Sequence, residues 1–160
     1  MIRSVVVAFA IAALGTSASA QPWGQNQPPD QWVMNCNLER GRDCTVSAMI
    51  DGGPNNLLGT FLILSYSVAY NKLTIVVDGR GQSAGLQVDW NPFITTTACS
   101  GRECTFPPAP TSDLLQQMLS GQQIVVQASL QSDSAVGPLQ QSLNGFAAQY
   151  RRAVAAQKGR

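Results

Sequence analysis

The stretch FLILSYSVAYNKLTIVV, residues 61–77, contains two apolar runs of strand length, Phe61–Tyr66 and Leu73–Val77. Both runs are rich in β-branched and aromatic side chains, which favour extended structure. Short apolar runs of this kind are typical of strands buried in a core. Asp78-Gly79, directly after the second run, is a turn signal. The stretch therefore predicts two buried strands with a turn after the second.

Similar runs recur on both sides of this stretch, at intervals of roughly ten residues. We expect further strands at Trp32–Cys36, Cys44–Met49, Leu86–Trp90, Phe93–Cys99, Cys104–Phe106, Ile124–Leu130 and Leu139–Leu143. No long helical pattern alternates with them, as it would in a parallel sheet. The chain is therefore predicted to be mainly β, an antiparallel β-sandwich.

Two helices are expected beside the strands. The segment TSDLLQQMLSG, residues 111–121, offers Thr111 or Ser112 as a cap, an apolar stripe and a closing Gly121, and predicts a short inserted helix over residues 112–119. Asn144 is expected to cap a C-terminal helix, whose four-residue spacing places three side chains on one face: Phe146, Tyr150 and Val154.

The N-terminus has the pattern of a secretory signal peptide. Arg3 precedes the ten-residue apolar run Val5–Leu14, and Ala18-Ser19-Ala20 fits a cleavage site. The alternative is a membrane anchor, but ten residues span only about half of a bilayer core of about 30 Å. We therefore expect export, cleavage before Gln21 and no transmembrane segment in the mature chain.

The predicted organisation is a signal peptide over residues 1–20, a Gln- and Pro-rich disordered leader over 21–31, one domain over 32–154 and a basic tail over 155–160. The whole chain has ten basic and nine acidic residues, and removing Arg3 leaves nine of each. A mature chain with no net charge lacks the basic stripe of a nucleic-acid-binding protein, so no nucleic-acid partner is expected.

Four cysteines in an exported chain predict a disulfide framework. Crossed pairings would close larger loops, so loop entropy alone does not exclude them. Each of the loops CNLERGRDC and CSGREC contains Gly beside charged residues, which suits a turn that brings two strand ends together. We therefore expect two local disulfides, Cys36–Cys44 and Cys99–Cys104.

A metal or redox site is the alternative for these cysteines. Structural zinc sites usually have two to four residues between paired cysteines and often include His. Here the spacers contain seven and four residues, and the chain has no His. The C-x-x-C spacing of a thioredoxin-type site is also missing. No metal and no cofactor are expected.

No catalytic residue is predicted. Gly81-Gln82-Ser83-Ala84-Gly85 matches the nucleophile elbow of serine hydrolases, but no helical pattern follows it and no His is present to act as the base. We expect a flexible turn there.

Asp78 and Asp89 are the candidates for paired carboxylates. The alternative is that Asp78 is a turn residue and Asp89 a solvent-facing strand residue. Trp32 and Trp90 are expected as core or sheet-face aromatics, with a sugar platform as the alternative.

The arrangement from Trp32 onward resembles the invasion-associated locus B family of exported Gram-negative bacterial proteins. The resemblance covers about residues 32–154. It depends on the two cysteine pairs, the segment GLQVD at residues 85–89, the helix that ends at Gly121, and the ending SLNGFAA, in which the motif residues are Ser142, Leu143, Gly145 and Phe146, with Trp32 at the start of the domain.

This resemblance implies an immunoglobulin-like sandwich, located in the periplasm, the outer envelope or outside the cell, with no enzymatic activity. Our first hypothesis is an envelope protein that acts by binding a protein partner, in the envelope or on a host cell. The alternatives are a carbohydrate-binding sandwich that uses Trp90 and Trp32, and a small envelope hydrolase that uses Asp78 or Asp89.

Overall fold

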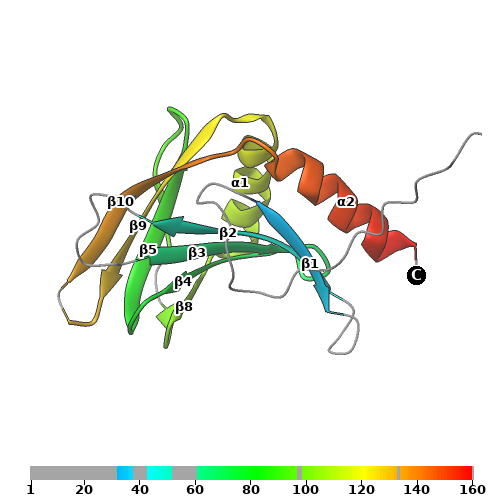
Figure 1. Cartoon of the computed structure of the whole chain (residues 1–160). Coiled ribbons are helices and arrows are strands. Elements are labelled where there is room, and N and C mark those ends of the chain that lie inside the picture. Colours follow the sequence, from blue (N-terminus) through cyan, green and yellow to red (C-terminus); the bar gives the residue numbers. More distant parts are fainter. Residues whose placement is uncertain (1–31, 38–42, 52–60, 97–98, 133, 160) are drawn as a thin grey trace, which may run out of the picture.

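The computed structural model describes residues 32–37, 43–51, 61–96, 99–132 and 134–159 of the 160-residue chain. In these ranges the chain forms two antiparallel sheets and two helices (Figure 1). The prediction of a mainly β antiparallel sandwich, with one inserted and one C-terminal helix, is confirmed. Its immunoglobulin-like character stays a prediction.

The first sheet has six strands in the order β1-β2-β3-β4-β8-β7. The strands are β1 (Val33–Asn37), β2 (Asp43–Asp51), β3 (Phe61–Ser67), β4 (Lys72–Val77), β7 (Cys99–Ser100) and β8 (Glu103–Thr105). The two runs that predicted strands at 61–66 and 73–77 are the adjacent central strands β3 and β4, with Leu64 opposite Ile75.

The second sheet has four strands in the order β10-β9-β5-β6. The strands are β5 (Gly81–Val88), β6 (Ile94–Thr95), β9 (Gln123–Leu130) and β10 (Ala135–Ser142). The predicted turn at Asp78-Gly79 is confirmed, and it carries the chain from β4 in the first sheet to β5 in the second.

One hydrophobic core lies between the layers. Alternate residues of β3 and β9 point inward, as the period of two in a strand requires. Leu62, Leu64 and Leu86 have no exposed surface. Both helices add side chains to the same core, and α2 lies beside β1 and β2 (Figure 1).

The helix α1 (Pro108–Ser120) begins four residues before the predicted start. Proline is tolerated in a first helical turn because the N–H groups there have no partner within the helix. Because Thr111 and Ser112 lie inside the helix, the expectation that one of them caps it is wrong. Thr111 is buried inside the helix, and its hydroxyl donates to the carbonyl oxygen of Pro107 at 2.8 Å.

The helix α2 (Phe146–Lys158) also differs from the expectation at its start. Gly145 precedes it with a left-handed backbone (φ 89°), and Asn144 makes no side-chain cap. Phe146 and Tyr150 share one face of the helix, as predicted, and pack on the core, but Ala153 is the buried residue one turn later and Val154 is half-buried. The helix continues to Lys158, into the segment expected as a basic tail.

Two predictions for the centre of the chain are wrong. Residues 81–85, expected as a flexible turn, form the first part of β5 and pair with β9. Glycine inside a strand often marks a close approach of other groups. A Cβ atom at Gly81 would lie 2.8 Å from Cys104 Sγ, so the disulfide occupies the space that a side chain would need.

The single strand expected over Phe93–Cys99 is instead two short strands in different sheets. Ile94 of β6 pairs with Leu86 in the second sheet, and Cys99 of β7 pairs with Cys104 in the first. Cys99 has to reach Cys104, so the chain must cross between the sheets before it. Residues 97 and 98 lie outside the described ranges.

Candidate functional site

Asp78 and Asp89, the candidates for paired carboxylates, lie at opposite ends of β5. Eight strand residues at about 3.3 Å each separate them by about 26 Å, too far for shared acid–base chemistry. Asp78 is exposed and forms an ion pair of 3.1 Å with Arg102. The two carboxylates are therefore not brought together.

Asp89 holds the connection between α1 and β9. Its Oδ1 atom accepts hydrogen bonds from the backbone N–H groups of Gln123 at 2.9 Å and Gln122 at 3.1 Å, and Oδ2 lies 3.2 Å from the Gln122 nitrogen. Asp89 itself has a left-handed backbone (φ 48°). The carboxylate that sequence reasoning considered for catalysis thus anchors a turn.

Ser83, the central residue of the G-x-S-x-G segment, lies within β5 opposite Ser129 of β9. A nucleophile elbow places its Ser at a sharp turn from a strand into a helix. Strand β5 continues for five residues after Ser83, to Val88, and the next described element is the short strand β6. The geometry of a serine hydrolase is therefore absent from this described segment.

The two tryptophans that the sequence singled out lie in opposite environments. Trp32 is 4% exposed and belongs to the core, as predicted. Trp90 is 95% exposed, so the expectation of a core or sheet-face side chain is wrong for it. With Trp32 buried, the two rings do not form a joint platform for a sugar.

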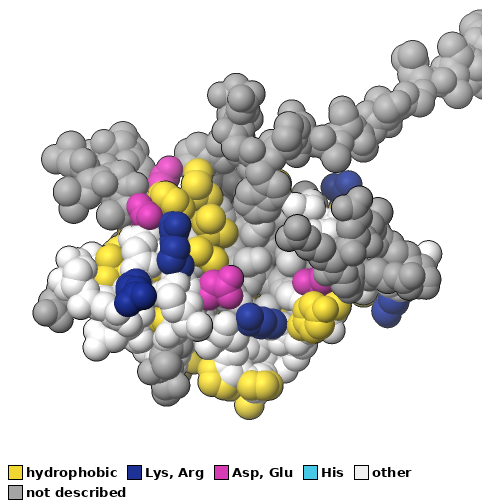
Figure 2. Space-filling model, turned by 90° about the horizontal axis from the view of Figure 1, so that it is seen from below, with side chains coloured by type: hydrophobic (Ala, Val, Ile, Leu, Met, Phe, Trp, Pro, Cys, Tyr) yellow, Lys and Arg dark blue, Asp and Glu magenta, His cyan; other side chains and the backbone are white. Residues whose placement is uncertain are grey.

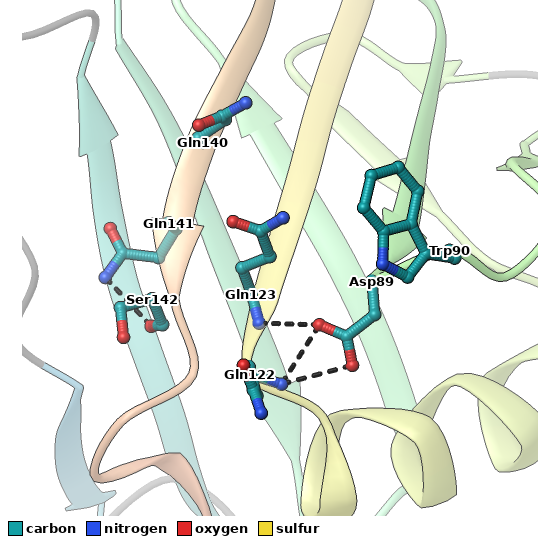
Figure 3. A pocket seen from close by; sticks show the side chains of 7 residues that line it. All are labelled: Asp89, Trp90, Gln122, Gln123, Gln140, Gln141 and Ser142. Atoms are coloured by element: carbon teal, nitrogen blue, oxygen red, sulfur yellow. Dashed lines mark hydrogen bonds between the residues drawn. The ribbon is translucent and has the colours of Figure 1, made fainter.

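A groove of about 630 Å³ lies beside Trp90. It is lined by Asp89, Trp90, Gln122, Gln123, Gln140, Gln141 and Ser142. In Figure 3 the Trp90 ring stands on one side, the three residues of β10 lie on the other, and Gln123 of β9 lies between them. Its volume falls within the range of about 300–1,000 Å³ that is usual for ligand sites.

Sequence reasoning missed the glutamines of this groove. The signal was present as two Gln-Gln pairs, at residues 122–123 and 140–141. Only the antiparallel register places them together, because Ser142 lies opposite Gln123 on the neighbouring strand.

The solvent-facing side of the first sheet carries a second feature, which we call the outer row: Met49, Ile63 and Val76. Met49 lies opposite Ile63, and Ile63 lies opposite Val76, on three adjacent strands. Met49 is 49% exposed and the other two are half-buried. The space-filling view of the face below the sheets shows hydrophobic side chains in several separate groups, some of them beside acidic and basic side chains (Figure 2).

The residues behind the family resemblance come together from the two ends of the domain. The ring centroids of Trp32 and Phe146 lie 4.7 Å apart in an edge-to-face contact. The Trp32 indole N–H donates to the main-chain oxygen of Ser142 at 2.8 Å. Leu143 is buried, and Gly145 supplies the left-handed residue that leads into α2. These residues form a structural cluster.

One perturbed ionisable group lies near this cluster. Burial of the Tyr66 ring, together with the neighbouring Tyr150 phenol, raises the pKa of Tyr66 to about 12. The Tyr66 hydroxyl donates to Asn71 Oδ1 at 2.6 Å, and its ring packs edge-to-face on Tyr150. A phenol that stays neutral and satisfied in this way is part of the core.

The four cysteines form the two local disulfides that were predicted, Cys36–Cys44 and Cys99–Cys104. Two structural disulfides indicate an oxidising, exported environment. Among the described residues, no group of His, Cys, Asp and Glu side chains is arranged to hold a metal ion. The same residues contain no helix long and apolar enough to span a membrane.

The chain was compared with protein-family models, curated proteins and solved structures, and none of the three comparisons finds a match.

Proposed function

We propose that this chain is an exported, non-enzymatic protein of the bacterial envelope that acts by binding a protein partner through the outer row. The partner lies in the periplasm or outer envelope, or on a host cell. The proposal includes membership of the invasion-associated locus B family. What supports membership is the residue pattern itself, together with the contact of its first and last motif residues, Trp32 and Phe146.

The observation that carries the binding proposal is the outer row. The solvent side of an antiparallel sheet is usually polar. Side chains directly opposite one another on adjacent strands lie about 4.5–5.5 Å apart, so Met49, Ile63 and Val76 form one continuous apolar strip. Contiguous apolar surface on a sheet face is typical of a protein interaction site.

The borders of the outer row suggest the chemistry of the partner. Glu103 lies opposite Val76 at the β8 end of the row and is exposed. Asp51 of β2 and Phe61 of β3 lie opposite each other on the same face, two residues along the strands from Met49 and Ile63. We therefore expect a partner surface with an apolar centre and a basic group facing Glu103.

Two observations argue against the hydrolase. The chain has no His to serve as a base near neutral pH. Asp78 and Asp89 lie at opposite ends of β5, and each is engaged, with Arg102 or with backbone N–H groups. Neither carboxylate therefore has the other within reach to form an acid–base pair.

Export is tested by the mass of the protein recovered from the periplasmic or extracellular fraction. The expected mass corresponds to a chain that begins at Gln21. Recovery of the uncleaved 160-residue chain in the cytoplasm would contradict the proposal. Changing Ala18 and Ala20 to bulky residues should block processing, because the cleavage site requires small side chains at these positions.

Binding is tested by capture of a partner from envelope extract with the mature chain. Met49→Glu places a charge in the outer row and should weaken capture by about tenfold or more. Thr45→Glu, on the same face of β2 but outside the row, is the matched control and should leave capture unchanged. Capture that survives Met49→Glu, or that both variants abolish, would overturn the outer row as the binding surface.

A further inference from the structure

The groove beside Trp90 is a second site, on the other sheet from the outer row. Six of its seven lining residues are polar, and four of those are glutamines. Its one ionisable group is Asp89, whose two oxygens accept hydrogen bonds from backbone N–H groups. We propose that this groove binds a neutral oligosaccharide, stacked on Trp90 and hydrogen-bonded by the glutamine amides.

Trp90 supplies the stacking surface. Its side chain is 95% exposed and stands at one wall of the groove (Figure 3). A pyranose ring has a face of polarised C–H groups and a rim of hydroxyls. The negative face of an indole attracts such C–H groups, and covering the indole removes apolar area from water. A sugar therefore matches both the wall and the polar floor.

The glutamines supply the hydrogen bonds. Each side-chain amide offers two N–H donors and one carbonyl acceptor, which suits a hydroxyl that both donates and accepts. The side chains of Gln122, Gln123 and Gln140 are exposed and make no hydrogen bond to the described parts of the chain. Their bonding capacity is available to a ligand, and no desolvated charge has to be neutralised.

The groove is held in shape before a ligand arrives. The backbone N–H of Asp89 donates to the Gln123 oxygen at 3.0 Å, and the Asp89 carboxylate accepts from Gln122 and Gln123. A Cβ atom at Gly121 would lie 2.6 Å from Val88 Cγ1, so the chain lies close against the end of β5 directly after α1. Trp90, the next residue after Asp89, therefore starts from a fixed backbone. A fixed backbone reduces the entropy lost on binding.

The charge of the site restricts the ligand class. No Lys or Arg lines the groove. A sulfated or sialylated sugar would find no cation there and would face the Asp89 carboxylate, so it should bind more weakly than a neutral sugar.

The test is titration of the mature chain with named oligosaccharides, from trimers to hexamers: the cello-, chito-, manno- and malto-series as neutral probes, with sialyllactose and a heparin hexasaccharide as charged ones. Calorimetry measures the affinity, and tryptophan fluorescence reports burial of an indole. We expect at least one neutral series to bind, with affinity that rises with length and a blue-shifted emission.

Variants test the assignment of residues. Trp90→Ala should weaken the best neutral probe by about tenfold or more, since it removes the stacking surface. Gln140→Leu should weaken it by about fivefold, the loss of one or two hydrogen bonds. Tyr70→Ala is the matched control, because Tyr70 is an aromatic residue, 66% exposed, in the turn between β3 and β4. It should change the affinity less than about twofold, since a surface substitution away from the groove is near neutral.

Several results would overturn the inference: no binding by any neutral series, tighter binding by a charged probe, or equal weakening by Trp90→Ala and Tyr70→Ala. Capture of a protein through Trp90, without sugar binding, would also overturn it. None of these results bears on the outer row, whose test depends on Met49.

Discussion

The indole nitrogen of Trp32 lies 2.8 Å from the main-chain oxygen of Ser142, 110 positions later in the chain. This hydrogen bond joins the residue before β1 to the end of β10, and so connects the two sheets. The Trp32 ring also packs on Phe146 at the start of α2. Three elements therefore depend on one side chain.

Trp32→Phe should destabilise the fold by about 1–3 kcal/mol, because the Ser142 oxygen loses the shorter of its two hydrogen bonds, keeping that from Gln141, and the smaller ring fills less of the core. Urea unfolding followed by circular dichroism measures the change. The matched control is Trp90→Phe, which alters a side chain that is 95% exposed and should be neutral within about 0.5 kcal/mol. Equal effects of both variants would contradict a role for this hydrogen bond.

Each disulfide should stabilise the chain by about 2–3 kcal/mol, chiefly by restricting the unfolded state. Reduction should therefore lower the melting temperature by several degrees or more, while a chelator should leave it unchanged. Under non-reducing conditions, cleavage after Arg40 or Arg42 should leave the Cys36 and Cys44 peptides joined. Cleavage after Arg102 should do the same for Cys99 and Cys104. A melting temperature that falls with the chelator would contradict the prediction that no structural metal is bound.

Gly81→Ala should cost about 1–3 kcal/mol, because the added Cβ would overlap the sulfur of Cys104, which the disulfide prevents from moving aside. The cost should shrink when Cys99 and Cys104 are both changed to Ala, and a double-mutant cycle by urea unfolding measures this coupling. Gly159→Ala serves as the control, since its Cβ would meet its nearest atom at an ordinary 3.4 Å. A cost that is the same with and without the disulfide would refute the coupling.

Stability should fall as the pH rises from about 10 to about 12. The folded state raises the pKa of Tyr66 to about 12, above the value of about 10 in an unfolded chain. The neutral phenol is therefore favoured by folding, and its stabilisation is complete below pH 10 and lost as the pH approaches 12. Tyr66→Phe should remove this dependence, and Tyr70→Phe should keep it. Urea unfolding across the range, with tyrosinate absorbance, provides the measurement.

Local sequence patterns correctly predicted the strands in which the residues themselves favour extended structure. Phe61–Ser67 and Lys72–Val77 alternate buried side chains with half-buried or exposed ones and contain β-branched residues, so they have few alternatives to extended structure. The disulfide pairing was predictable for a related reason. Cys36 lies directly opposite Cys44 and Cys99 opposite Cys104, in short local ladders that need no distant element.

The mistaken predictions concern residues whose conformation depends on distant neighbours. Gly81–Gly85 was expected as a turn because glycine and serine favour turns. Pairing with β9, about forty residues later, makes it a strand instead. The inserted helix was expected to start at residue 112, but Pro108 begins α1, since a first helical turn tolerates proline.

The sequence by itself determined the mainly β composition, the two covalent links and the amphipathic helices, because these depend on side-chain periodicity and on residues close together in the chain. Only the tertiary structure decided which solvent-facing residues meet. Met49, Ile63 and Val76 became one row through the register of three strands, and Trp90 came beside Gln140 through the order of the second sheet. Strand register is set by long-range hydrogen bonds and shared burial, which a single sequence does not display.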